Sequence, residues 1–139
     1  MNKQFEIHQR LTSGGFYLGS ILNCALLLKN NAHYKWFILI PKVDDSIIDI
    51  DQLSQLQIDD LNQATYSLSS FIKTTFSPDK LNIGNIGNVV QQMHVHVVGR
   101  FHDDPAWPKV VWEHPKKISY PTSEVTKIKH QAQSFFSFE

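Results

Sequence analysis

Ten residues near the middle of the chain, QQMHVHVVGR (91–100), restrict its fold more than any other segment. Polar and apolar residues alternate in this run, as in a β-strand, where side chains two positions apart point to the same face. Gln92, His94 and His96 are therefore predicted to line one face of a strand, and the apolar residues between them the other. Polar side chains on a buried strand need either hydrogen-bond partners or a function.

Three further apolar runs predict strands, and a weaker one precedes the histidines. Val, Ile, Leu and aromatic residues dominate these runs, and Asn30-Asn31 between the second and third predicts a turn, hence an antiparallel hairpin. The predicted strands are Phe16–Leu22, Cys24–Lys29 and Tyr34–Pro41, with weak strand character over Leu81–Asn88.

The apolar spacing changes to three and four residues between about Gln57 and Phe76, which predicts an amphipathic helix packed on a sheet. A second helix is predicted over Thr122–Phe136, and a short one over residues 4–11. Strands and helices in this order predict an α+β fold with an antiparallel sheet. We expect one domain over residues 1–139, with its core at about 20–100 and a Pro- and Trp-rich segment plus the last helix at 101–139.

Charge and cysteine content exclude several classes of function. Lys and Arg number 13, as do Asp and Glu, so we expect no broad basic surface for nucleic acid. A single cysteine, Cys24, allows neither an intramolecular disulfide nor a multi-cysteine zinc site, and we expect it in the core. No apolar run approaches the length of a membrane span, and the first residues lack the apolar run of a signal peptide. We therefore expect a cytoplasmic protein with no membrane partner.

The stretch LNIGNIGN (81–88) is rich in hydrogen-bond donors and contains no carboxylate. Gly84 and Gly87 allow close approach of the backbone and leave amide groups free to face an anion. Asn82 and Asn88 add side-chain amides, each with two donor hydrogens. This inventory suits phosphate oxygens better than a hard metal cation, which prefers oxygen ligands.

The pair His94-x-His96 has three interpretations. The imidazoles are structural and satisfied, or they chelate zinc or iron, or one of them is a nucleophile that attacks phosphorus. A metal would require a third ligand, and the remaining histidines that could provide one are scattered without ligand spacing. The preceding Asn/Gly stretch shifts the balance towards phosphate chemistry, with Arg100 nearby as added positive charge.

The segment Gln92–Val98 resembles the motif of the histidine-triad (HIT) family, in which three histidines alternate with apolar residues and two apolar residues follow. WFILIPK (36–42) is similar to the family's strand ending in Ile-Pro-Lys, and RFHDDPAWPKVVW (100–112) resembles a bacterial subgroup of HIT hydrolases. The resemblance implies a single HIT-like domain with an antiparallel sheet of about five strands, one main helix and terminal helices.

The resemblance also implies roles for individual residues. His94 matches the central histidine, the family's nucleophile, and His96 matches the last histidine, which hydrogen-bonds near the phosphate and the leaving group. Asn88 stands where the family commonly has a phosphate-binding Gln, and Asn82 lies near a phosphate-contacting Asn. Asn31 lies near the family's ribose-binding Asp.

The expected activity is hydrolysis or transfer of a nucleotide through a nucleotidyl-histidine, from dinucleoside polyphosphates or nucleoside phosphoramidates. The resemblance implies a homodimer that requires no metal or cofactor. Gln92 departs from the motif, because glutamine replaces the first histidine and cannot take up a proton near neutral pH. Two rival hypotheses therefore stand beside the enzyme: a nucleotide-binding or sensing module with weak or no activity, and a metal-dependent enzyme using His94 and His96.

Overall fold

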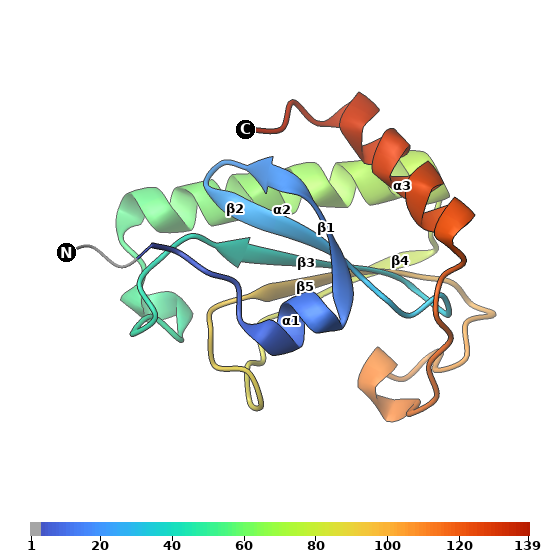
Figure 1. Ribbon diagram of the computed structural model, residues 1–139. Coiled ribbons are helices and arrows are strands. Elements are labelled where there is room, and N and C mark those ends of the chain that lie inside the picture. Colours follow the sequence, from blue (N-terminus) through green and yellow to red (C-terminus); the bar gives the residue numbers. More distant parts are fainter. Residues whose placement is uncertain (1–3) are drawn as a thin grey trace.

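Five strands form one antiparallel sheet in the computed structural model, which describes residues 4–139 (Figure 1). The spatial order is β1-β2-β3-β5-β4. The strands are β1 (Gly15–Ile21), β2 (Cys24–Lys29), β3 (Lys35–Pro41), β4 (Lys80–Gly84) and β5 (Val95–Arg100). The helices are α1 (Gln9–Ser13), α2 (Gln55–Phe76) and α3 (Thr122–Phe135), with 3₁₀ turns at Ile50–Gln52 and Val111–Glu113. The predicted α+β fold is confirmed.

Two consecutive hairpins build the first half of the sheet. The turn between β1 and β2 places Leu22 and Asn23 at φ 47° and 59°, the positive values that a tight two-residue hairpin turn requires. β2 and β3 form the second hairpin, as the sequence predicts. In the connection between them, the Oδ1 of Asn31 accepts the backbone N–H of His33, and the Oδ1 of Asn30 accepts that of Tyr120 in the C-terminal segment.

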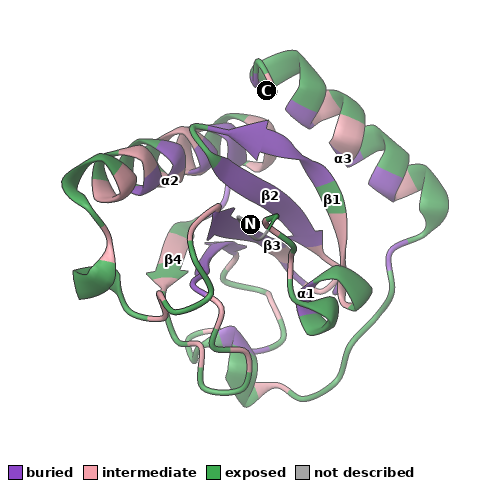
Figure 2. Ribbon diagram, turned by 60° about the vertical axis from the view of Figure 1, so that its left-hand side comes forward, coloured by how far each residue is buried: buried purple, intermediate pink, exposed green. Residues whose placement is uncertain are grey.

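Helix α2 covers one face of the sheet and buries the positions that its spacing predicts (Figure 2). Ser54 and Gln57 form a reciprocal capping box at its start, and Ser77 ends it in the left-handed conformation at φ 53°. Val95 and Val97 of β5 face this side and join the main core. The buried residues of α2 are Leu61, Ala64, Leu68, Phe71 and Ile72.

The opposite face of the sheet lies against α1 and the segment 101–120 (Figure 1). Trp36 and Ile38 of β3 pack there with Val98 of β5 and with Val111 from the C-terminal segment. His96 lies between Val95 and Val97 on β5, so strand alternation turns it towards this second layer. One predicted face of the histidine strand therefore contacts the apolar core, and the other faces a layer that contains polar groups.

Three predicted boundaries differ from the structure. The weak strand predicted over Leu81–Asn88 is β4, Lys80–Gly84, and residues 85–88 lie in the loop that follows it. The helix predicted over residues 4–11 starts only at Gln9, where the Nδ1 of His8 accepts from the N–H of Arg10. The backbone of residues 6–8 is instead hydrogen-bonded to the side chain of Gln92. The histidine strand starts at Val95, so Gln92 and His94 lie in the loop that enters β5.

Cys24 lies in the core as predicted, with 1% of its surface exposed. Burial raises the pKa of its thiol to about 12, so the thiolate is not populated at neutral pH. In the part of the chain that the structure describes, no helix is long and apolar enough to cross a membrane.

Candidate active site

The imidazoles of His94 and His96 lie against each other at the entry to β5. Their ring centroids are 4.9 Å apart and the rings are inclined at 72°. Both residues are buried, with 4% and 7% of their surfaces exposed. Because His94 precedes the strand, its ring can approach that of His96 more closely than the two-residue spacing of a regular strand allows.

His94 is held in one tautomer by its own loop. Its Nδ1 lies 2.6 Å from the backbone carbonyl oxygen of Gln92. A carbonyl oxygen only accepts hydrogen bonds, so Nδ1 carries the proton. The lone pair of a neutral His94 is therefore on Nε2, which has no hydrogen-bond partner among residues 4–139.

His96 is held in the opposite tautomer by an indole. The Nε1–H of Trp36 donates to Nδ1 of His96 at 2.9 Å. An indole N–H only donates, so Nδ1 of His96 is the unprotonated nitrogen and its Nε2 carries the hydrogen. The pair thus combines one free lone pair with one N–H donor.

Burial keeps both imidazoles neutral. It lowers the pKa of His94 below 6.5, against the opposing hydrogen bond to Gln92 and with a further lowering by the charge of Lys29. Burial, then His94, then Lys29 lower the pKa of His96 to about 3. Neutral imidazole is the nucleophilic form of histidine, so the burial of His94 favours reactivity at neutral pH.

Lys29, at the end of β2, is a part of this site that sequence reasoning missed. Its side chain is on the same sheet face as Trp36, and its Nζ lies 5.6 Å from the centroid of the Trp36 ring. Burial and then the charge of Lys117 lower the pKa of the half-buried ammonium. Within residues 4–139 no carboxylate forms an ion pair with Lys29, so its charge is available to an anion.

Two hollows are lined by residues of the loop between β4 and β5; His96 lines one of them, and His94 lines neither. One, of about 570 Å³, is lined by His96, by β4 and its following loop, and by residues 108–112 of the C-terminal segment. Trp112 forms part of its wall, with its ring centroid 5.0 Å from that of His96. The other, of about 660 Å³, lies between residues 6–9, Asp45 and the loop 88–92. Both are large enough for a nucleotide-sized group.

The residues predicted to bind phosphate and ribose do not share one hollow, and Asn31 lines neither of the two. Asn88 is exposed and lines the larger hollow, next to Gly87, whose φ of 63° suits glycine. Asn82 lines the smaller hollow, where its Oδ1 accepts from Arg100 and its amide hydrogens remain as donors. Asn31 is buried in the β2–β3 connection, and its Oδ1 accepts from the N–H of His33.

The side chain of Gln92 ties residues 6–8 to the loop that enters β5. Its Oε1 accepts from the N–H of His8 and its Nε2 donates to the carbonyl oxygen of Glu6, both at 2.8 Å. Its backbone carbonyl oxygen accepts a hydrogen bond from Nδ1–H of His94. Gln92 therefore contacts the His94 ring through its main chain, while its side chain is directed to residues 6–8.

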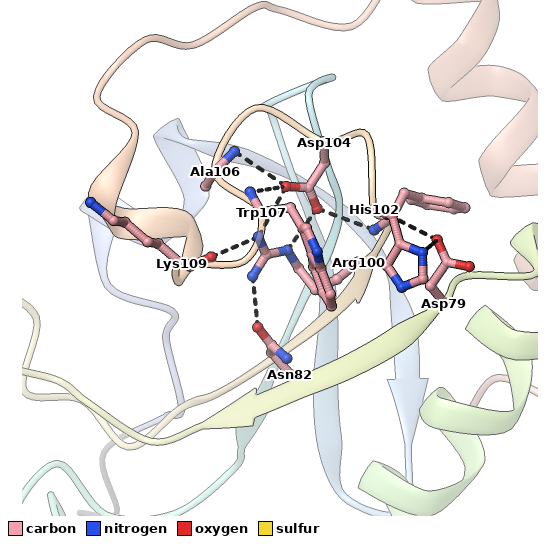
Figure 3. A network of polar contacts seen from close by, with 9 residues as sticks. Asp79, Asn82, Arg100, His102, Asp104, Ala106, Trp107 and Lys109 are labelled. Carbon is pink, nitrogen blue, oxygen red and sulfur yellow. Dashed lines mark hydrogen bonds and ion pairs between the residues drawn. The ribbon is translucent and has the colours of Figure 1, made fainter.

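Arg100 has a structural role rather than a free charge near the site (Figure 3). Its guanidinium forms two hydrogen bonds with the carboxylate of Asp104, at 2.7 and 2.9 Å, and also donates to Asn82 and to the carbonyl of Lys109. Asp104 in turn accepts backbone N–H groups of the following turn. This network fixes residues 101–109, and through them the position of Trp112.

Within residues 4–139, no three His, Cys, Asp or Glu side chains form a group that could hold a metal ion. A metal on His94 and His96 would therefore lack a third protein ligand of these types from the described chain. The donor set of imidazole, amide and ammonium groups suits an anion.

The HIT domain model matches residues 17–103 of this chain. A histidine triad (HIT) protein from Sinorhizobium meliloti 1021 is 31% identical, with a TM-score of 0.90 over 95% of this chain and 97% of that chain. A histidine triad protein from Marinobacter aquaeolei VT8 is 32% identical, with a TM-score of 0.90 over 96% of each chain. One from Bradyrhizobium japonicum is 29% identical, with a TM-score of 0.91 over 95% of this chain and 98% of that chain. No curated protein matches the chain.

Proposed function

Because this chain belongs to the HIT domain family, we propose that it hydrolyses or transfers nucleotides through a covalent nucleotidyl-His94 intermediate. The observation that carries this proposal is the tautomer of His94. Its Nδ1–H is bonded to the Gln92 carbonyl, so Nε2 carries a lone pair beside the N–H donor of His96. Substrates of the proposed class are dinucleoside polyphosphates and nucleoside phosphoramidates.

In the proposed first step, Nε2 of His94 attacks the α-phosphorus and the bond to the leaving group breaks. The imidazole becomes positively charged as the N–P bond forms, and the carbonyl oxygen of Gln92 stabilises that charge through Nδ1–H. In the second step water attacks phosphorus, the P–N bond breaks, and its electrons return to Nε2. A nucleoside monophosphate leaves, and the proton lost by water passes to solvent.

The proposal assigns several donors to the phosphate. We propose that Nε2–H of His96 and the charge of Lys29 stabilise the phosphoryl oxygens in the transition state. The backbone at Gly87 and the amides of Asn88 and Asn82 are proposed phosphate contacts from the two hollows. Asn31 is the proposed ribose contact.

A nucleotide-binding module without turnover is the second candidate function. Gln92 favours it, because this position cannot take up a proton and its side chain is committed to residues 6–8. Such a module would bind a nucleotide reversibly and release it chemically unchanged.

A turnover screen separates the two candidates. Mono- and dinucleotide substrates are incubated with the protein, with and without excess chelator, and products are separated by chromatography. If the chain is the proposed enzyme, it should release a nucleoside monophosphate at the same rate with and without chelator. Tight binding in calorimetry without any product would support the module, and loss of turnover with chelator would support a metal-dependent enzyme.

The low pKa of His94 predicts the pH dependence of the reaction. The nucleophile must be unprotonated, so kcat/KM should remain constant as the pH falls through 6.5, the ordinary pKa of histidine, and decrease only below it. A pH–rate profile of kcat/KM tests this expectation. An inflection at or above pH 6.5 that follows His94 protonation would contradict it.

The same burial predicts lower stability in acid. The folded state binds a proton at His96 only near pH 3, whereas the unfolded chain binds one near pH 6.5. The unfolded state therefore holds more protons between these values, and the free energy of unfolding falls as the pH falls through this window. Urea unfolding at each pH measures this effect. It also identifies the pH range in which the protein stays folded, so that changes in kcat/KM there reflect the reaction and not unfolding.

A further inference from the structure

The nature of the leaving group determines whether the first step needs an acid. A phosphate leaves phosphorus as an anion near neutral pH and requires no proton. The nitrogen of an alkyl phosphoramidate must gain a proton before or during cleavage of the P–N bond, and a positioned general acid typically contributes about 10²–10⁴-fold to such a step. The groups beside His94 therefore decide which substrates react.

His96 is a hydrogen-bond donor that cannot act as that acid. Trp36 occupies Nδ1 with its indole N–H, so the ring holds a single hydrogen, on Nε2. Transfer of this hydrogen would leave an imidazolate anion in a buried site. A second proton could enter only at Nδ1, and there it would face the Trp36 N–H.

The surroundings of His96 also oppose a second proton. The imidazole of His94 and the indole of Trp112 lie against its ring, and the Lys29 ammonium adds positive charge from the same sheet face. None of the carboxylates in residues 4–139 is hydrogen-bonded to the ring of His94 or of His96. Burial and these neighbours lower the pKa of His96 to about 3, which agrees with the geometry.

Gln92 cannot replace the missing acid. Its amide does not titrate, and its side chain is bonded at both ends to the backbone of residues 6–8. Lys29 is a proton-bearing cation whose charge acts on both His94 and His96. Its positive charge favours a leaving group that departs with a negative charge.

We infer that this site cleaves phosphoric anhydrides and other P–O bonds whose leaving group departs as an anion, and that it discriminates against phosphoramidates of alkyl amines. The inference rests on the proposed function and narrows its substrate class. The N–P bond to His94 forms, the P–O bond breaks, and its electron pair leaves on the phosphate oxygen. The Nε2–H of His96 and Lys29 stabilise that oxygen without transferring a proton.

The test compares three substrates that share one nucleoside monophosphate and differ in the leaving group: a nucleoside diphosphate, p-nitrophenolate and a primary alkyl amine. At neutral pH the first two should have kcat/KM values at least about 10²-fold above that of the amide. Comparable values for the anhydride and the alkyl amide would overturn the inference and leave the nucleotidyl-His94 proposal intact. Absence of turnover with all three would overturn both.

Trp36→Phe tests the cause of the discrimination. This change removes the N–H at Nδ1 of His96 and keeps most of the ring, so His96 becomes able to hold two protons. The anhydride-to-amide ratio of kcat/KM should narrow by about tenfold or more, within the range a general acid contributes. Trp112→Phe is the matched comparison, since Trp112 packs on the same ring without a hydrogen bond to it. Because Trp112 lines the hollow, this change should lower kcat/KM for the anhydride and the amide alike and leave their ratio at the wild-type value.

Lys29→Met separates charge stabilisation from proton donation. Loss of the charge should reduce kcat/KM for the anhydride at least as strongly as for the amide. A selective loss of amide cleavage would identify Lys29 as a general acid and overturn the inference. An unchanged ratio in Trp36→Phe would also contradict it, because the indole N–H would then have no influence on leaving-group preference.

Discussion

Replacing His94 by Ala is expected to reduce kcat by at least about 10³-fold while nucleotide binding changes little, because the change removes the group that bonds to phosphorus. The proposed phosphate donors, on His96, Lys29, Asn82 and Asn88, remain in place, so the dissociation constant should stay within a few-fold. Stopped or quenched assays give kcat, and calorimetry gives the dissociation constant.

His102→Ala is the matched control for this change. The imidazole of His102 is 69% exposed and lies beside Asp79 (Figure 3). Its replacement should leave kcat unchanged. Wild-type turnover in the His94→Ala protein would exclude His94 as the nucleophile.

Replacing Asp104 by Ala is expected to lower the free energy of unfolding by about 3–5 kcal/mol, because it leaves the Arg100 guanidinium buried without its counter-charge. Only 1% of the Arg100 side chain is exposed. The same change removes the acceptor of three backbone N–H groups in the turn after β5. Burial opposes the charge of Asp104, but the hydrogen bonds from Arg100 and the turn prevail and lower its pKa.

Urea unfolding monitored by circular dichroism measures this loss. Asp103→Ala is the control, because Asp103 is the exposed neighbour in the same turn and its removal should change stability by less than about 0.5 kcal/mol. Equal midpoints for Asp104→Ala and wild type would show that the network does not hold the C-terminal segment. Because that segment carries Trp112 to the site, kcat/KM should fall along with stability in Asp104→Ala.

Local sequence patterns were sufficient for most of the fold. The apolar positions of α2 follow from their spacing, and the buried residues Leu61, Ala64, Leu68, Phe71 and Ile72 are among those predicted. β2 has the predicted bounds because its apolar run is short and flanked by turn residues. The helix predicted over residues 4–11 is partly wrong because a residue distant in the sequence determines the backbone conformation there. Residues 6–8 are not helical because Gln92, more than eighty positions away, binds their backbone.

The candidate site was predictable as a motif but not as a set of contacts. The spacing of His94 and His96 identified the pair, yet the tautomer of His96 depends on Trp36, sixty residues earlier. Lys29 ends an apolar strand and carries no motif, so only sheet pairing places it beside Trp36. Arg100 is near the histidines in sequence, but its charge is satisfied by Asp104.

Mass spectrometry of a quenched reaction tests the central claim, that Nε2 of His94 is an unprotonated nucleophile towards a bound nucleotide. The protein is mixed with substrate, denatured within the turnover time at alkaline pH to preserve the phosphoramidate, and digested. The peptide that contains His94 should carry the mass of one nucleoside monophosphate, and the adduct should disappear when substrate is exhausted. Steady turnover with no adduct, or an adduct on any other residue, would contradict the account.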